Sequence, residues 1–293
     1  MNQVDVEHRL TARIIEAVGR FQILSTEQIR GMAAPDRSLR RVQAALEQLA
    51  AQGLVQLISI RHPGGRTWRL TSKGAVAAGA RALDPALAAG RFMGDCLARA
   101  EVALAWMRAA RERGHEAGVR SFEHRKELPG GSVPPVCIAE SELSYLLIDP
   151  ARGARPYRRW IEIDRTTDPL LPASERLARY AAVPRAAAQE PALFKTVRYR
   201  TWPQLVVVMV GPEKERQLRL GHLLALLSND ADQAESPIAL RFVAFEELVQ
   251  AGPFASIFTR LEEPNGEQVD WLAAKPPNQR RSVPAAELEV ARA

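Results

Sequence analysis

Residues 25–74 decide the fold of the first quarter of the chain, and they read STEQIRGMAAPDRSLRRVQAALEQLAAQGLVQLISIRHPGGRTWRLTSKG. Ser25 and Gln28 have the three-residue spacing of a capping box, in which each side chain satisfies a backbone amide at a helix start. This spacing predicts a short helix that ends near Ala33. The Pro35-Asp36 pair then breaks that helix and caps the next one.

The elements around that short helix complete a known order. Residues 7–20 have the apolar periodicity of a helix, and another helix is expected over residues 36–52. Two strand-like runs follow, residues 54–60 and 67–70, around the turn signal Pro63-Gly64-Gly65. Three helices followed by a hairpin predict a winged helix-turn-helix.

Three arginines lie at the start of the helix over residues 36–52. Arg37, Arg40 and Arg41 are spaced i, i+3 and i+4, which places them on one face. The opposite, core-facing stripe comprises Leu39, Val42, Leu46 and Leu49. The first turns of a recognition helix meet base edges, and the planar arginine fork can bond guanine O6 and N7 together. We therefore expect these arginines to contact duplex DNA.

Arg61, His62 and Arg66 flank the tip of the predicted wing, where they could reach phosphates or a minor groove. The charge distribution agrees with that role, because the whole chain has a formal net charge of +6. Up to position 75 it has eleven basic and six acidic residues, and eleven minus six gives +5. This local excess favours a polyanionic partner. The alternative is a solvated charged face on a module that contacts protein, for instance in a homodimer.

The remainder of the chain predicts a mixed α/β domain, which makes the protein α+β or α/β overall. A long helix is expected over residues 92–113, after a hinge at Asp84-Pro85. The strand-like run 204–210 is almost entirely apolar, so it should be a central strand covered on both faces. The expected organisation is a winged helix-turn-helix at 1–83, a connecting helix at 84–117, an α/β domain at 118–262 and a mostly disordered tail at 263–293.

Two carboxylates share one face of a predicted strand in that domain. Alternation along a strand points Trp160, Glu162 and Asp164 one way. Ile161 and Ile163 point the other way. A carboxylate pair of this kind could hold Mg²⁺, which could activate water for phosphodiester cleavage. The alternative is a solvent-facing pair at a strand end, bonded to nearby arginines.

The order of these pieces resembles the replication-relaxation family of bacterial plasmids and integrated mobile elements. The resemblance covers about residues 5–250: a winged helix, a long helix at 92–114, a strand reading Glu-hydrophobic-Asp-Arg at 162–165, and a helix ending in Arg179-Tyr180. It implies a DNA-binding protein that regulates or initiates replication, transfer or transcription of a mobile element. It also implies a second domain similar to restriction-endonuclease-like folds, whose active site uses an acid followed by Glu-x-Lys.

The chain departs from that active-site pattern twice. Val136 stands where the first acid would lie, and Asp164 stands in the place of the lysine. Arg176 lies where relatives often have a lysine, but a guanidinium stays protonated and cannot act as a base. The acids that could replace the missing one are Glu140, Glu142 and Asp149. The resemblance thus implies a degenerate site, and the first alternative is a metal-dependent nickase with Glu162 and Asp164 as ligands.

No segment of the sequence predicts a resident cofactor or a membrane span. Glycine-rich phosphate loops and a Gly-x-Ser-x-Gly elbow are absent. Cys96 and Cys137 form neither a disulfide framework nor a metal motif, so we expect two buried thiols. The strongest apolar run, 205–210, is too short to cross a bilayer, and the first residues lack a signal-peptide pattern. We expect a cytoplasmic protein without a cofactor, Mg²⁺ excepted if it is a nuclease.

Overall fold

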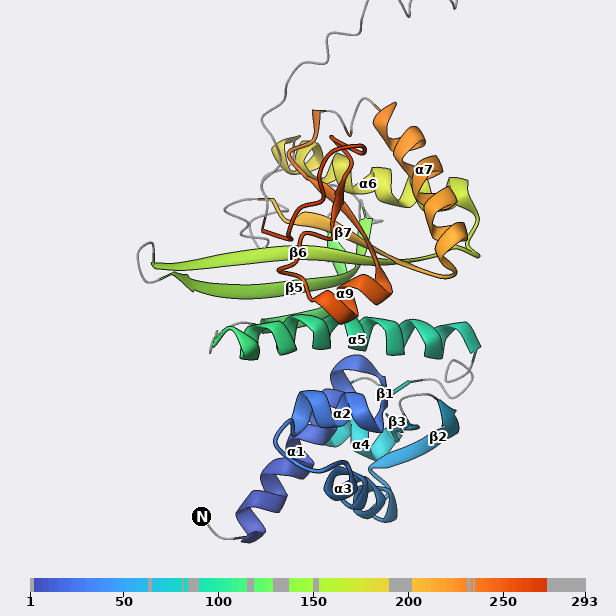
Figure 1. Ribbon diagram of the computed structural model, residues 1–293. Helices are drawn as coiled ribbons and strands as arrows, with labels where there is room; N and C mark the ends of the chain where they lie inside the picture. Colours follow the sequence, from blue (N-terminus) through green and yellow to red (C-terminus); the bar gives the residue numbers. More distant parts are fainter. Residues whose placement is uncertain are drawn as a thin grey trace, which may run out of the picture.

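A computed structural model gives the arrangement of the chain (Figure 1). It describes residues 3–62, 65–80, 82–83, 90–114, 119–128, 137–149, 153–189, 202–230, 233 and 235–272. Helices combine with a three-stranded and a six-stranded sheet, so the predicted mixed α/β class is confirmed. None of the helices in these ranges is long and apolar enough to cross a bilayer.

Residues 3–80 form an N-terminal module of helices and one small sheet. Its elements are α1 (Gln3–Phe21), β1 (Ile23–Ser25), α2 (Thr26–Ala33), α3 (Leu39–Ala51), β2 (Val55–His62), β3 (Gly65–Leu70) and α4 (Ser72–Ala77). The strands pair antiparallel in the order β1-β3-β2. The helices and hairpin expected from the sequence are therefore present, with β1 added between α1 and α2. Pro63 and Gly64 of the turn lie outside the described residues.

The start of α2 agrees with the sequence in detail. The Ser25 hydroxyl accepts from the Gln28 N–H at 3.2 Å, and the Gln28 side-chain oxygen accepts from the Ser25 N–H at 3.1 Å. The predicted capping box is therefore confirmed. Two orphan amides at the helix start are satisfied in this way, and the direction in which α2 leaves β1 is fixed.

The start of α3 differs from the expectation. Ser38, not Asp36, is the cap, and its hydroxyl accepts from the Arg41 N–H at 3.4 Å. Leu39 is 39% exposed, so its predicted place in the core is wrong. Leu39 is the first residue of α3 and lies before the part of the helix that packs against α1 and α2. The buried stripe therefore begins only at Val42. It consists of Val42, Ala45, Leu46 and Leu49.

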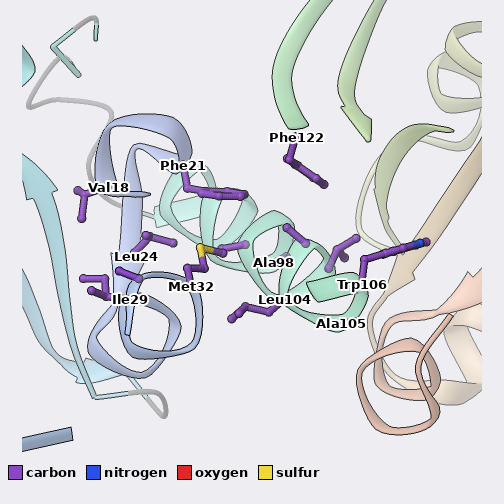
Figure 2. Close-up of a cluster of buried hydrophobic side chains, with 14 of the residues drawn as sticks. Val18, Phe21, Leu24, Ile29, Met32, Ala98, Leu104, Ala105, Trp106 and Phe122 are labelled. Atoms are coloured by element: carbon purple, nitrogen blue, oxygen red, sulfur yellow. The ribbon is translucent and has the colours of Figure 1, made fainter. Parts of the chain in front are cut away.

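The helix α5 (Gly90–Glu112) lies between the N-terminal module and the large sheet (Figure 1). Figure 2 shows side chains from the module, such as Phe21 and Met32, meeting Leu104 and Ala98 of α5 in one continuous core. The ring of Phe21 lies 5.3 Å from that of Phe122, across the two parts of the molecule. The helix predicted as a connection at 84–117 is thus a shared core element.

The large sheet has six strands in the order β4-β5-β6-β7-β8-β9. The elements of this part are β4 (Val119–Leu128), β5 (Cys137–Asp149), β6 (Gly153–Arg165), α6 (Leu170–Gln189), β7 (Gln204–Val210), α7 (Glu213–Ser228), β8 (Leu240–Ala244), α9 (Phe245–Ala251) and β9 (Thr259–Arg260). The strands β6, β7 and β8 are parallel, and the outer pairings are antiparallel. Cys96 and Cys137 are buried free thiols, as expected.

Helices cover both faces of this sheet. Val206 and Val208 of β7 belong to the core shared with α5 and α9. Leu205 and Val207 belong to a second core under α6 and α7. The prediction that residues 204–210 form a central strand covered on both faces is therefore confirmed.

The segment after β9 is ordered further than the sequence suggests. Trp271 is completely buried against Trp106, and its carbonyl accepts from the Arg159 guanidinium at 2.7 Å. Residues 263–272 are therefore part of the fold, because Trp271 anchors this polar stretch, and the mostly disordered tail expected over 263–293 stays a prediction for the remainder. Residues 273–293 lie outside the described part of the chain.

Candidate functional site

The first candidate site is the outer face of the N-terminal module. Within the N-terminal module, α3 packs against α1, α2 and β2, whereas α5 contacts the module through α1, α2 and β1. Figure 1 accordingly shows α3 on the side of the module away from α5 and the large sheet. The arginines expected to contact DNA, Arg37, Arg40 and Arg41, are all exposed on that side.

The three arginines are not all on the helix. Arg37 lies in the turn before the Ser38 cap, so only Arg40 and Arg41 belong to the first turn of α3. The guanidinium of Arg41 is 3.9 Å from the carboxylate of Glu7 on α1, and both side chains are solvent-exposed. Such an ion pair is weak, so Arg41 can turn toward another anion at little cost.

The hairpin β2–β3 places Arg66 beside α3. Its guanidinium donates to the Glu47 carboxylate at 2.8 Å. The carbonyl of Arg66 accepts from the Thr26 hydroxyl at 3.0 Å, which fixes the backbone of the hairpin to α2. Arg61 and His62 end β2, but their side chains lie outside the described residues. The hairpin and α3 thus present one surface, with Glu47 as an acid inside it.

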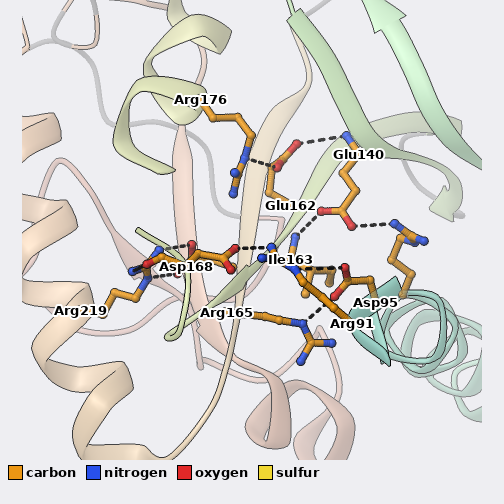
Figure 3. Close-up of polar contacts among 11 residues, drawn as sticks. Arg91, Asp95, Glu140, Glu162, Ile163, Arg165, Asp168, Arg176 and Arg219 are labelled. Atoms are coloured by element: carbon orange, nitrogen blue, oxygen red, sulfur yellow. Dashed lines mark hydrogen bonds and ion pairs between the residues drawn. The ribbon is translucent and has the colours of Figure 1, made fainter. Parts of the chain in front are cut away.

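The second candidate site is the acid pair on β6, Glu162 and Asp164, and Figure 3 shows Glu162 with its partners Glu140 and Arg176. Glu162 and Trp160 do lie on the side of β6 that α6 and α7 cover, as the alternation predicts. The side chains of Glu162 and Asp164 are only 2% and 1% exposed. The alternative of a solvent-facing pair is therefore wrong, because both side chains are buried, but its prediction of arginine partners is confirmed.

Glu162 is held by α6 and by the neighbouring strand. Its carboxylate accepts from Arg176 at 3.0 Å, from the Tyr180 hydroxyl and from the Glu140 N–H at 3.1 Å. Burial, together with the negative charge of Glu140, raises the pKa of Glu162 from 4.5 to about 7 against the opposing effect of Arg176. Sequence reasoning missed Tyr180 as a partner of Glu162. The helix expected to end at Arg179-Tyr180 continues to Gln189, so that expected end is wrong and Tyr180 lies within α6.

Asp164 is bound by one arginine of α7. Arg219 donates to both oxygens of the carboxylate, with Nη2 2.8 Å from Oδ1, and it also donates to the Asp168 carbonyl. The hydrogen bond to Asp164 raises the pKa of Arg219. This two-point geometry occupies the oxygens that a divalent cation would need. No signal in the sequence linked Arg219 to Asp164, because 55 residues separate them.

The acids considered as replacements lie in different places. Glu140 is beside Glu162, and its carboxylate accepts from the Ile163 N–H at 2.9 Å and from Arg99 of α5 at 2.8 Å. Burial raises the pKa of Glu140. Glu142 instead accepts from the indole of Trp160 at 3.1 Å. The side chain of Asp149 lies outside the described residues.

These contacts make a charge-balanced network rather than a ligand cluster. Across the described ranges, no group of three or more His, Cys, Asp or Glu side chains is placed to hold a metal ion. A cavity of about 370 Å³ lies where β7 and β8 end, lined by residues such as Arg216 and Phe242, and neither Glu162 nor Asp164 contributes to its wall. The network joins α5, α6 and α7 to the sheet at β6, so in this structure it stabilises the fold.

Comparison with known proteins gives one match. A family model described as Replication-relaxation matches residues 15–197, which is more than half of the 293-residue chain. The matched region runs from α1 through α6 and includes the outer face of the N-terminal module and the acids of β6. No curated protein matches the chain. No solved structure matches it either.

Proposed function

The chain belongs to the replication-relaxation family, and on that premise we propose that it binds duplex DNA by placing α3 in the major groove. Residues 3–80 have the element order of a winged helix-turn-helix, which supports α3 as the recognition helix and β2–β3 as the wing. The family points to replication or transfer of a plasmid or mobile element as the process, and transcriptional control would use the same binding mode.

The observation that carries this proposal is the position of the first turn of α3. Arg40 and Arg41 are exposed at the end of the helix that meets base edges in this class of module. The opposite stripe, from Val42 to Leu49, is buried, so the arginine face is the free face. Because α5 packs elsewhere on the module, a duplex can approach α3 without meeting the large sheet.

The acid pair on β6 supports a DNA-binding role without cleavage. A hydrolytic metal site needs carboxylate oxygens that face the ion and the substrate. Glu162 and Asp164 are buried and direct their oxygens to Arg176 and Arg219 instead. We therefore propose that the second part of the chain is a nuclease-like scaffold whose former site now stabilises the fold.

The test is equilibrium binding of the full chain to a genomic duplex selected by the native protein and to a scrambled duplex. The chain should bind with an affinity that falls steeply as salt rises, since each neutralised phosphate adds about one unit to the slope of log affinity against log salt. Arg40→Ala and Arg41→Ala should each cost about 1–3 kcal/mol on the selected duplex and relax sequence preference.

The matched control is the double variant Arg179→Ala/Lys214→Ala, which removes two exposed positive charges from α6 and α7. It should leave sequence preference unchanged. Binding that ignores salt, or equal losses in the control and in the α3 variants, would reject α3 as the DNA-contacting helix. A chain that forms a stable dimer through α3 and binds no duplex would favour the protein-interaction alternative.

A further inference from the structure

The hairpin of β5 and β6 extends beyond the large sheet. The neighbouring strands pair with only part of this hairpin. The strand β4 pairs with β5 at residues 137–145, and β7 pairs with β6 from Arg159 onward. Between these limits, within the described chain, residues 146–149 pair only with residues 153–156. Figure 1 shows this two-stranded ribbon projecting past the end of α5. We call residues 146–149 and 153–158 the β-ribbon.

The β-ribbon is basic and exposed. Residues 146–158 read LLIDPARGARPYR, with three arginines and one aspartate, so this stretch has a net charge of +2. The side chains of Arg155 and Arg158 are exposed on it. Arg158 lies 3.8 Å from the Glu142 carboxylate but keeps 42% of its side chain in solvent.

Further arginines lie in the last turn of α5 and directly after it. Arg113 lies over the ring of Phe254 at 4.3 Å, and Phe254 packs against Tyr145 at the base of the β-ribbon. Two residues earlier, in the last turn of α5, Arg111 donates to the Gly31 carbonyl of the N-terminal module. Burial lowers the pKa of Arg111, and the positive charges of Arg108 and Arg13 lower it further against the pull of Asp36. Basic side chains therefore follow one another from α1 across the end of α5.

We propose that the β-ribbon and the adjoining end of α5 form a second contact for the phosphate backbone of duplex DNA, separate from α3. A two-stranded ribbon fits the width of the DNA major groove, and exposed arginines on it can reach the phosphates on either side. The inference shares with the proposed function only the choice of duplex DNA as partner, because it depends on none of the residues of α3.

Phosphate is the chemistry that this surface selects. An arginine fork bonds phosphate oxygens at two points, and clustered positive charge attracts a polyanion over about one Debye length. The β-ribbon contributes charge but few base-reading positions, so it should add affinity without adding sequence preference. A chain with both contacts would span a longer stretch of duplex, or hold two duplexes, than α3 alone.

The test compares the full native chain with Arg155→Ala/Arg158→Ala in salt titrations of duplex binding. Loss of two phosphate contacts should reduce the salt slope by about two units and lower the affinity equally for selected and scrambled duplexes. Arg155→Lys/Arg158→Lys keeps the charge and should retain most of the slope. The control Arg179→Ala/Lys214→Ala removes the same charge from α6 and α7 and should leave the slope nearly intact.

Footprinting with hydroxyl radicals provides the second readout. The native chain should protect a longer backbone segment than Arg155→Ala/Arg158→Ala, while the part protected by α3 stays the same. An unchanged slope and footprint in the ribbon variant, or an equal loss in the α6/α7 control, would overturn this inference. A different result would reject the proposed function, namely duplex binding that does not change in Arg40→Ala and Arg41→Ala. The two outcomes are therefore distinguishable.

Discussion

Arg219 on α7 binds both carboxylate oxygens of Asp164 on β6, and both side chains are buried. The pair links the helix that covers one face of the sheet to the end of a central strand. In the same strand Glu162 is bound by Arg176 of α6. The two carboxylates on this face of β6 are thus both held by ion pairs within the fold.

Breaking the Asp164–Arg219 pair should destabilise the protein. Asp164→Asn leaves the buried Arg219 guanidinium without the Asp164 charge, and removing one partner of a buried pair typically costs about 3–5 kcal/mol. Urea unfolding would measure the loss. The double variant Asp164→Leu/Arg219→Met removes both charges and should be more stable than Asp164→Asn. If the double variant lost as much stability as Asp164→Asn and Arg219→Met lose together, the pair would do more than balance charge.

The ionisation of Glu162 should give stability a pH dependence. Its folded-state pKa, about 7, lies above the ordinary value of 4.5, so the folded chain binds this proton more tightly than the unfolded chain. The free energy of unfolding should therefore fall as pH rises through this window. Glu162→Gln cannot ionise and should lose that part of the fall. An equal fall in the free energy of unfolding between pH 4.5 and about 7 for the native chain and for Glu162→Gln would contradict the assignment, since Glu140 titrates in both.

The β6 acids should not support DNA cleavage. Purified native chain and Glu162→Gln would be incubated with supercoiled, linear and single-stranded DNA in the presence of Mg²⁺ or Mn²⁺. We expect no cleavage by either, because the carboxylates are buried and bonded to arginines. Nicking by the native chain that disappears in Glu162→Gln would establish the nickase instead. Metal binding alone would not decide the question, since two carboxylates can bind a cation weakly.

Glu47 should restrain DNA binding by the wing. Its carboxylate holds Arg66, which would otherwise be available to a phosphate. Glu47→Gln removes a negative charge from the proposed surface and frees the guanidinium, so affinity for all duplexes should rise several-fold, by about 1 kcal/mol. Glu175→Gln, an exposed acid on α6, is the matched control and should have little effect. A fall in affinity after Glu47→Gln would mean that the ion pair positions Arg66 for binding.

The sequence determined the elements whose signals are local. The capping box of Ser25 and Gln28 specifies a helix start through contacts between near neighbours, and the apolar composition of residues 204–210 specifies a strand buried on both faces. Both predictions are confirmed. The strand β4 was missed, since residues 119–128 have a polar, charged composition and only pairing with β5 makes them a strand. Leu39 was assigned to the core because periodicity gives a face but not where the covering surface ends.

Only the tertiary structure decided the surroundings of the candidate residues. The alternation along β6 placed Glu162 and Asp164 on one face, but their partners Arg176 and Arg219 come from two different helices. Whether a carboxylate binds a cation, water or a guanidinium depends on which groups the packing brings within hydrogen-bond distance, and no local pattern records that. Trp271 makes the same point, since a single side chain that fills a space beside Trp106 orders a polar segment whose composition favours disorder.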